Sequence, residues 1–474
     1  MHWRVSGRIL SLDPGAEPIR FRALFPQEGW CGKMLHIGGG GFDGTLPFLG
    51  AHGVGKEMWA GAPVPLARGF VVYGSDSGHS VPSANMDNWN NPDAANFSVN
   101  DEMLLNYAHA AIKKVHDTVL FLVRCAYGTD PERSYFAGSS NGGRQGLIAA
   151  QRYGDDYDGI ICGYPAIHWM GMVLFGNHIA NLEDELGEAC RIDEATWARA
   201  EQMIISACDA DDGVEDGLIS NLRGARRREQ GLLSDLAKLL NPAQMRLLEA
   251  CIEGIDTGFL QNDEFPSYPG FAVLQGEPLR DDESLLRGHA ISENPGKRDS
   301  STVNFADAVI SRQIMRDIDF DARCFDPWEH AEEVRRASAL LDASSTDISG
   351  FMDGGGKIIL YHGTYDQLIS VKSTIGYYEA LCRSYGRDAL REHARLFIVP
   401  GAGHMYGRFE MGADLLGMLD AWVCEGTAPS SFAVHETNSL HVQREQLVCE
   451  YPYYARYAGG DPSKAASYEP CLDA

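Results

Sequence analysis

The sequence lacks any run of the ~18 to 20 apolar residues that a helix needs to cross a bilayer, so no membrane span is predicted. The N-terminal residues 1–8 show one strand-like alternation and lack the apolar core of a secretory signal. We therefore expect a cytoplasmic protein if the chain is complete, and a secreted one if the sequence is a mature form whose leader has been removed.

Positive charge is also scarce. Lys and Arg number 40 against 66 Asp and Glu, which gives a formal net charge of −26. A field of that sign repels phosphate backbones, so we expect no nucleic acid partner, whereas a neutral small molecule is little affected. The 474 residues, of which 44 % are hydrophobic, are enough for one large domain with an insertion.

Paired cysteine motifs are missing too. The 11 cysteines are an odd number and none forms a Cys-x-x-Cys pair, which excludes a disulfide-stapled small fold and gives no support to a zinc ribbon. Cys449 and Cys471 bracket a tail rich in Gly, Pro and Tyr in which we predict neither helix nor strand. A disulfide there would close a loop of about twenty residues and stabilise the fold by ~3 kcal/mol, and two free thiols are the open alternative.

Short apolar strands alternate with helical patterns in the first third of the chain. Strands are predicted at 33–37, 69–73 and 134–137, and helices at 106–127 and 143–153. Apolar residues recur at helical spacing in the helices, and the strands end at Gly-rich turns. This order is typical of an α/β fold whose mostly parallel sheet is covered on both faces.

Residues 169–347 differ in character, because charged helical patterns dominate and strand-like runs are scarce. Strands resume at 357–361 and 396–399. We predict one α/β domain in two parts, residues 1–168 and 348–474, with a large, mostly helical lid, residues 169–347, inserted between them.

The strongest motif is Gly138-Ser139-Ser140-Asn141-Gly142, which fits Gly-x-Ser-x-Gly between a strand and a helix. In that context it is a nucleophile elbow, in which the serine sits on a sharp turn and small residues let strand and helix pass closely. The free N–H groups of the helix start favour developing negative charge. We therefore predict an α/β-hydrolase fold with Ser140 as nucleophile; the alternative is an ordinary Gly-rich turn.

A general base and an orienting carboxylate are expected later in the chain, in the order Ser, Asp, His. Asp366 follows the strand at 357–361, and His404 follows the strand at 396–399 through a Gly-x-Gly turn. Loops at the carboxyl ends of parallel strands are where such sheets build their sites. We predict Asp366 and His404 as the partners of the nucleophile and interpret His362 as a packing or supporting residue.

The run Gly38-Gly39-Gly40-Gly41-Phe42-Asp43-Gly44, called the glycine loop below, follows an early strand. An oxyanion hole needs two backbone N–H donors, one from the residue after the nucleophile and one from such a loop. We predict Asn141 as the first donor and Gly40 or Gly41 as the second. The spacing also matches Gly-x-Gly-x-x-Gly of phosphate sites, but no helix pattern opens after it.

Five of the eight residues from Asp209 to Asp216 are acidic. Such density repels itself unless a cation is bound, and oxygen ligands alone favour calcium. The segment is not an EF-hand, because Ser220 stands where the bidentate Glu should be. A calcium site and a solvated acidic turn are the two interpretations.

Together these segments resemble the tannase and feruloyl esterase family, which includes feruloyl esterases, tannases and bacterial mono(2-hydroxyethyl) terephthalate hydrolase. The resemblance covers nearly the whole chain, in the glycine loop, 135–145, 157–161, 208–217 and the loops of the predicted Asp and His. It implies a disulfide between Cys449 and Cys471. It also implies a structural calcium ion (Ca2+) held by the carboxylates of Asp209, Asp212 and Asp216 and the carbonyls of Val214 and Leu218.

One departure concerns the nucleophile. The family usually joins a Cys before the nucleophile to a Cys after the catalytic His by a disulfide, and these positions hold Ser139 and Met405 here. A second cysteine expected to pair with Cys208 is also missing. Packing and hydrogen bonds would then have to hold the catalytic loops, and the losses fit a protein that does not rely on an oxidising compartment.

We expect a serine carboxylic ester hydrolase that acts on a small-molecule ester through an acyl-enzyme intermediate. By resemblance, the ester is one of an aromatic, feruloyl- or galloyl-like acid. Two alternatives stay open. An acyltransferase or cyclising enzyme would use the same triad, because only water access separates it from a hydrolase, and a non-catalytic ligand-binding protein would keep the fold alone.

Overall fold

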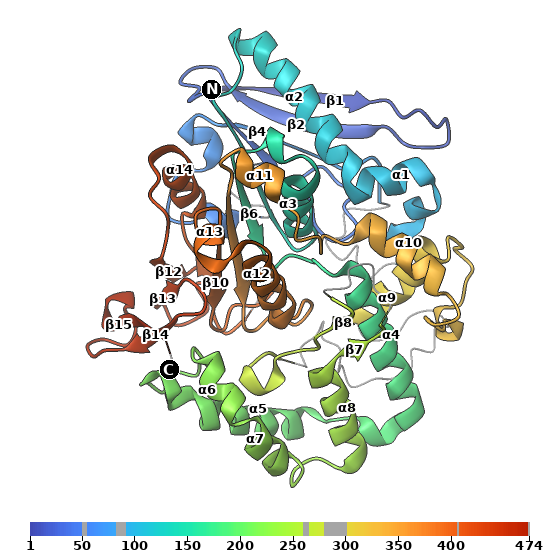
Figure 1. The fold of residues 1–474 in the computed structure, drawn as a ribbon, viewed down its shortest axis with the longest axis vertical. Helices are drawn as coiled ribbons and strands as arrows, with labels where there is room; N and C mark the ends of the chain where they lie inside the picture. Colours follow the sequence, from blue (N-terminus) through green and yellow to red (C-terminus); the bar gives the residue numbers. More distant parts are fainter. Residues whose placement is uncertain (50–54, 82–91, 259–264, 279–300, 405–406, 473–474) are drawn as a thin grey trace.

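A computed structural model describes residues 1–49, 55–81, 92–258, 265–278, 301–404 and 407–472, and Figure 1 shows the fold. Met405 lies outside the described residues. Within them, one sheet of eight strands runs through the molecule in the order β1-β2-β4-β3-β5-β6-β9-β10. These strands are β1 (His2–Ile9), β2 (Ile19–Pro26), β3 (Lys33–Ile37), β4 (Val71–Ser75), β5 (Arg133–Ser139), β6 (Gly159–Gly163), β9 (Lys357–Gly363) and β10 (Ala394–Val399).

The six strands from β4 to β10 pair in parallel, and β1 and β2 extend one edge as antiparallel strands. The predicted mostly parallel sheet is therefore confirmed. Helices accompany its parallel strands. They are α1 (Asp101–Leu105), α2 (Ala111–Tyr127), α3 (Asn141–Arg152), α12 (Val371–Tyr385), α13 (Arg387–Arg391) and α14 (Leu415–Glu425).

Helices cover both faces of the sheet, as the sequence predicts. Successive strand residues point to opposite faces. Phe136 and Ile160 share an apolar cluster with residues of α2, α3 and α12. Tyr135 and Ile161 instead share one with residues of α14. Both faces of these strands are thus buried, which explains why the strands read as continuous apolar runs.

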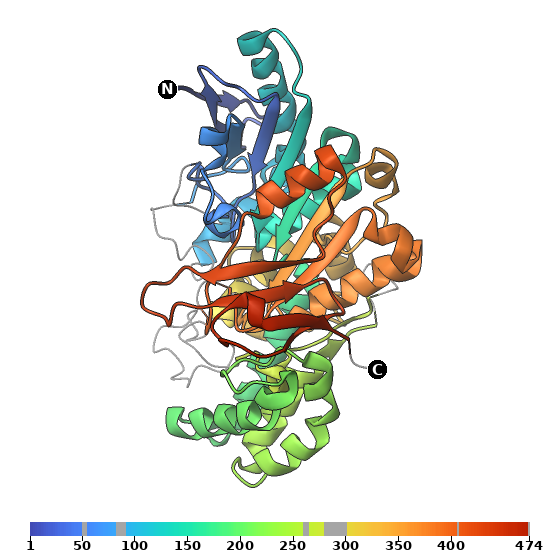
Figure 2. The same cartoon turned by 90° about the vertical axis from the view of Figure 1, so that its left-hand side faces the viewer.

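The lid is inserted at one point of the sheet. β6 and β9 are hydrogen-bonded neighbours, although residues 164–356 lie between them in the sequence. Figures 1 and 2 show α5 to α8 together at one end of the molecule. The helices between β6 and β9 are α4 (Trp169–Leu186), α5 (Glu194–Cys208), α6 (Leu222–Arg227), α7 (Glu229–Leu236), α8 (Pro242–Glu253), α9 (Ser301–Val309), α10 (Ala331–Leu341) and, just after the predicted lid, α11 (Ser349–Asp353). Among its described residues the strands are the two-residue β7 (Ile255–Asp256) and β8 (Ser267–Tyr268). The exact domain limits, 168/169 and 347/348, stay a prediction.

The prediction that the C-terminal tail lacks strands is wrong. β11 (Met411–Gly412), β12 (Ser431–Glu436) and β13 (Glu445–Cys449) form one small sheet, and β14 (Tyr454–Tyr457) and β15 (Tyr468–Cys471) form another. The strands of the second ladder are short and part-exposed, so they lack the apolar alternation that marks a strand in a sequence.

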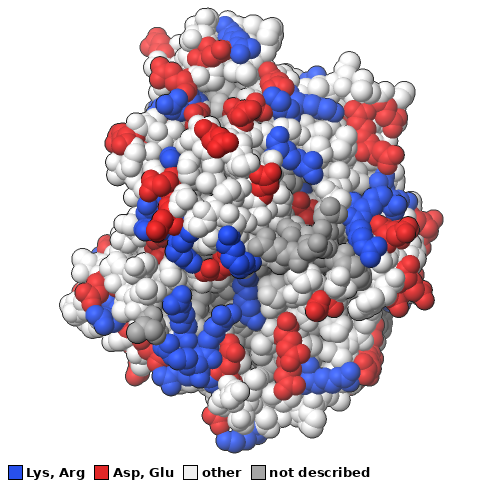
Figure 3. All heavy atoms as spheres, in the orientation of Figure 1, with Lys and Arg blue, Asp and Glu red and all other residues white. Residues whose placement is uncertain are grey.

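The surface carries both signs of charge despite the net negative balance. Figure 3 shows Lys and Arg gathered in the region of α6, whose last turn contributes Arg226 and Arg227. None of the described helices is long and apolar enough to cross a membrane.

Candidate active site

Ser140 stands between the end of β5 and the start of α3, with φ 60° and ψ −124°. A non-glycine residue rarely adopts this backbone conformation, and such strain concentrates at functional sites. The turn is also tight. A Cβ on Gly138 would lie 2.5 Å from the carbonyl carbon of Gly142, and one on Gly142 would lie 2.6 Å from Gly39 O. The predicted strand–turn–helix arrangement around Ser140 is present.

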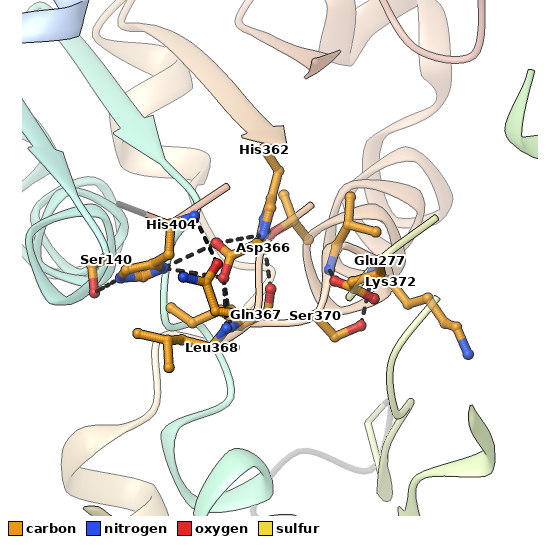
Figure 4. A network of polar contacts seen from close by, with 12 residues as sticks. Ser140, Glu277, His362, Asp366, Gln367, Leu368, Ser370, Lys372 and His404 are labelled. Atoms are coloured by element: carbon orange, nitrogen blue, oxygen red, sulfur yellow. Dashed lines mark hydrogen bonds and ion pairs between the residues drawn. The ribbon is translucent and has the colours of Figure 1, made fainter. Parts of the chain in front are cut away.

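The structure brings the three predicted catalytic side chains together (Figure 4). His404 Nε2 lies 3.0 Å from Ser140 Oγ, and His404 Nδ1 lies 3.0 Å from Asp366 Oδ2. Asp366 follows β9 and His404 follows β10, two parallel neighbours whose carboxyl ends meet at the same sheet edge. A hydroxyl, an imidazole and a carboxylate in line form a proton relay for activating the hydroxyl.

Asp366 is buried and bonded to three hydrogen-bond donors, one of which is His404. Its Oδ1 accepts the N–H groups of Leu368 and Ile369 at 2.9 Å each. His362 Nε2, which bonds to Ile369 O, also lies 3.3 Å from Oδ2, the oxygen nearest His404. Burial alone would raise the pKa of Asp366, but His404 and His362 lower it below its ordinary value. The carboxylate therefore stays ionised, and His362 is a direct partner of Asp366 rather than a packing residue.

Tyr164 packs against the histidine loop from the end of β6. Its ring centroid lies 4.7 Å from that of His404, and burial together with the nearby Glu57 carboxylate raises the pKa of its hydroxyl. Tyr361 donates to the same Glu57 at 2.8 Å. The histidine loop, where the sequence lacks the expected disulfide, is thus in contact with the sheet edge through this ring. Sequence reasoning missed Tyr164, and only its place directly after β6 marks it.

Of the predicted oxyanion donors, Asn141 directly follows Ser140, and the glycine loop meets the same turn where Gly38 and Gly39 contact Gly142. Asn141 is the first residue of α3, so its amide has no partner within the helix. The amide of Gly39 is already bonded to Gln145 Oε1 at 3.0 Å. The amides of Gly40 and Gly41 donate to no other described residue, and a Cβ on Gly40 would meet open space. Both remain candidates for the second donor.

Arg144 is a second residue to which the sequence analysis gave no role. It is fully buried, and its Nε donates to Asn141 Oδ1 at 2.8 Å. Its guanidinium also donates to Leu341 O at the end of α10 and lies 5.2 Å from the Trp169 ring. The residue after the nucleophile is therefore tied to the lid through one buried cation.

Comparison with known proteins identifies the family. A sequence model described as tannase and feruloyl esterase matches residues 3–472. The chain belongs to this family. An uncharacterized esterase of Agrobacterium fabrum is 34 % identical over 99 % of this chain and 85 % of its own length. Mono(2-hydroxyethyl) terephthalate hydrolase of Piscinibacter sakaiensis is 28 % identical over 98 % and 84 %.

Solved structures of this family share the fold. Feruloyl esterase B from Aspergillus oryzae superposes with a TM-score of 0.77 at 21 % identity, over 99 % of this chain and 90 % of that one. Tannin acyl hydrolase from Aspergillus niger gives a TM-score of 0.70 at 18 % identity, over 100 % and 86 %. The predicted α/β-hydrolase fold is confirmed, and the chain is a carboxylic ester hydrolase of the tannase and feruloyl esterase family.

The acidic segment of this esterase folds into a compact turn after α5. Asp209 accepts the N–H of Gly217 at 2.9 Å, and Asp216 accepts that of Leu218 at 3.1 Å. Asp212 is buried, and burial together with the neighbouring carboxylates of Asp216 and Asp209 raises its pKa to about 7. Burial and the neighbouring Asp209 carboxylate also raise the pKa of Asp216, and carboxylates gathered in this way are the kind of ligand that a hard divalent cation prefers.

Among the described side chains, the one group of three whose candidate metal-ligand atoms all lie within 4.8 Å of one another is His116, Asp117 and Asp156, outside the acidic segment. However, Lys113 Nζ lies 2.7 Å from Asp117 Oδ1 and 3.0 Å from Asp156 Oδ2. The ammonium group already neutralises both carboxylates, so we assign no metal to this cluster.

The predicted disulfide between Cys449 and Cys471 is not formed, and both residues are free thiols. Cys449 ends β13, opposite Ser431, whereas Cys471 ends β15, opposite Tyr454. The two cysteines are therefore fixed by ladders of different sheets. Burial also raises the pKa of Cys449 to about 12, and a thiol that stays protonated is a poor nucleophile for forming a disulfide.

Proposed function

We propose that this esterase is a serine hydrolase that cleaves esters of aromatic acids through an acyl-enzyme intermediate. The distance of 3.0 Å between Ser140 Oγ and His404 Nε2, on a nucleophile held at φ 60°, is the observation that carries the proposal. A buried, ionised Asp366 completes the relay.

In the proposed mechanism, Ser140 Oγ attacks the ester carbonyl while His404 Nε2 takes its proton. Asp366 fixes the tautomer of His404 by accepting from Nδ1 and stabilises the imidazolium that forms. The N–H groups of Asn141 and of Gly40 or Gly41 hold the oxyanion. His404 then returns the proton to the leaving alcohol. Water next attacks the acyl-enzyme while His404 takes its proton, and His404 gives that proton to Ser140 Oγ as the acid leaves.

The aromatic acyl group is proposed from the relatives. Proteins named mono(2-hydroxyethyl) terephthalate hydrolase and probable feruloyl esterase are each 28 % identical to this chain over more than nine-tenths of it. The terephthaloyl and feruloyl groups in those names are both aromatic carboxylic acids. An enzyme that acts on such esters needs a pocket for a flat aromatic acyl group, and we propose the same for this chain.

Labelling and hydrolysis together test this proposal. A fluorophosphonate probe is expected to label the wild type at Ser140, and S140A is expected to take no label and to lose hydrolysis. A panel of feruloyl, galloyl, terephthaloyl and short aliphatic esters then ranks substrates by kcat/KM. A native protein without label contradicts the serine mechanism, and equal rates across the panel contradict the aromatic specificity.

We also propose that the acidic segment holds a structural calcium ion. Asp209, Asp212 and Asp216 would supply carboxylates, and Val214 and Leu218 carbonyl oxygens. The support is the buried Asp212, whose pKa is raised first by burial and then by the carboxylates of Asp216 and Asp209. Calcium would neutralise this cluster and fix the turn between α5 and α6.

A further inference from the structure

Asp43 closes the glycine loop with a buried carboxylate. It adopts φ 57°, in the left-handed region, and its Oδ2 accepts from Ser77 Oγ and from Gln145 Nε2 at 2.7 Å each. The other end of the Gln145 amide accepts the N–H of Gly39 at 3.0 Å. Asp43 packs so closely on Gly39 that a Cβ there would overlap its carboxylate. One carboxylate and one amide therefore fix the loop to α3, the helix that starts at the nucleophile.

The carbonyl groups of the loop are held as well. Tyr107 Oη donates to Gly41 O at 2.9 Å, and His79 Nε2 donates to Phe42 O at 2.6 Å. Gly40 thus lies between Gly39, whose amide is fixed, and Gly41, whose carbonyl is fixed. The directions of the candidate oxyanion N–H groups are set by these side chains and not by the glycines, which have no conformational preference of their own.

We propose that Asp43, acting through Gln145, is a positioning residue of the oxyanion hole, and that it does so as an ionised carboxylate. The inference rests on the proposed function, because it assumes acyl transfer at Ser140. An oxyanion donor acts only within about 2.7 to 3.1 Å of the developing charge, so a loop that loses its anchor costs rate through misplacement.

The surroundings of Asp43 allow its carboxylate to change charge near pH 6. Burial raises the pKa of Asp43 to about 6, although Ser77 and Arg144 favour its ionised form. Arg144 from α3 and Tyr107 from the π-helical segment between α1 and α2 are the titratable groups that act on it, and His79 bonds to the carbonyl of the adjacent Phe42. Burial raises the pKa of Tyr107 and lowers that of His79 to about 4, so both are neutral near pH 6 while Arg144 is cationic. Asp43 is the facing group that changes charge there.

The test compares wild type with D43N and Q145L by steady-state kinetics on an ester that the wild type hydrolyses, from about pH 5 to 9. We expect kcat to fall about tenfold to a hundredfold in both variants, with KM changed less than about threefold. The acid limb of the wild-type profile includes the protonation of Asp43 near pH 6. D43N lacks this component, so its acid limb is expected to be shallower.

Asp342 offers a matched control. It is part-buried, its pKa is raised by burial to about 6, and it also faces Arg144. Its partners, however, are Met170 N and Ser338 Oγ rather than the glycine loop. D342N is expected to keep kcat within about threefold of wild type. An equal loss in D342N would mean that the charge opposite Arg144 carries the effect, and an unchanged D43N would also overturn the inference. A wild type that hydrolyses no ester contradicts the proposed function instead.

Discussion

The ring of Tyr164 lies against the ring of His404, with centroids 4.7 Å apart. Tyr164 directly follows β6, so its ring places the histidine loop against the edge of the sheet. A non-covalent contact thus restrains His404 in the loop where the resemblance leads one to expect a disulfide.

Removing the Tyr164 ring is expected to slow hydrolysis. Y164F keeps the ring that packs on His404, so we expect kcat to stay within about threefold of wild type. Y164A frees the His404 ring, and we expect kcat to fall about tenfold to a hundredfold. Y361F is the control, because it removes a bond to Glu57 without touching His404. Equal kcat in Y164A and Y361F would refute the role of the ring.

Removing His362 is expected to weaken the orientation of Asp366. H362L deletes the donor 3.3 Å from Asp366 Oδ2, and a hydrogen bond to a charged group is worth ~1.5 to 3 kcal/mol. We expect kcat to fall about tenfold to a hundredfold at an unchanged fluorophosphonate-labelled fraction. H393L is the control, since His393 bonds to Gly356 O away from the site. Unimpaired turnover in H362L would show that His362 only packs.

Calcium is expected to raise the melting temperature more at pH 8 than at pH 5.5. The pKa of Asp212 is raised to about 7, so the fold favours its protonated form. Without a cation, ionising Asp212 therefore costs stability, and that cost grows as pH rises from its ordinary pKa through about 7. Calcium binds the ionised form and removes the cost, so its effect grows with pH.

Scanning fluorimetry with EGTA, calcium or magnesium measures this effect. D212N is expected to abolish the calcium response, and D211N to keep it, because Asp211 is paired with Arg228 outside the proposed ligand set. If calcium does not change the melting temperature at pH 8, the proposed calcium site is wrong and the acidic segment is a solvated turn.

All 11 cysteines are expected to react as free thiols. Thiol titration of the denatured protein, purified without reductant, should give the full number, and dithiothreitol should not change the melting temperature. Two thiols fewer, with Cys449 and Cys471 linked in a non-reduced peptide map, would restore the predicted disulfide.

The sequence predicts the sheet core and the three catalytic positions because each carries a local signal. The apolar runs at 33–37 and 357–361, the glycines around Ser140 and the Gly-x-Gly turn before His404 are such signals. Tyr164 and Asp43 carry none, since their roles come from contacts with chain segments far away in sequence. The short ladder of β14 and β15 was missed because part-exposed strands lack alternation.

The insertion between β6 and β9 has a consequence for how the enzyme is made. β9 can pair with β6 only after residues 164–356 have been synthesised, and pairing at such sequence separation is slow to form. Asp366 and His404 lie beyond that crossing, whereas Ser140 and the glycine loop lie before it. A nascent chain therefore carries Ser140 long before its proposed partners, and the proposed triad can form only once β9 and β10 have been made.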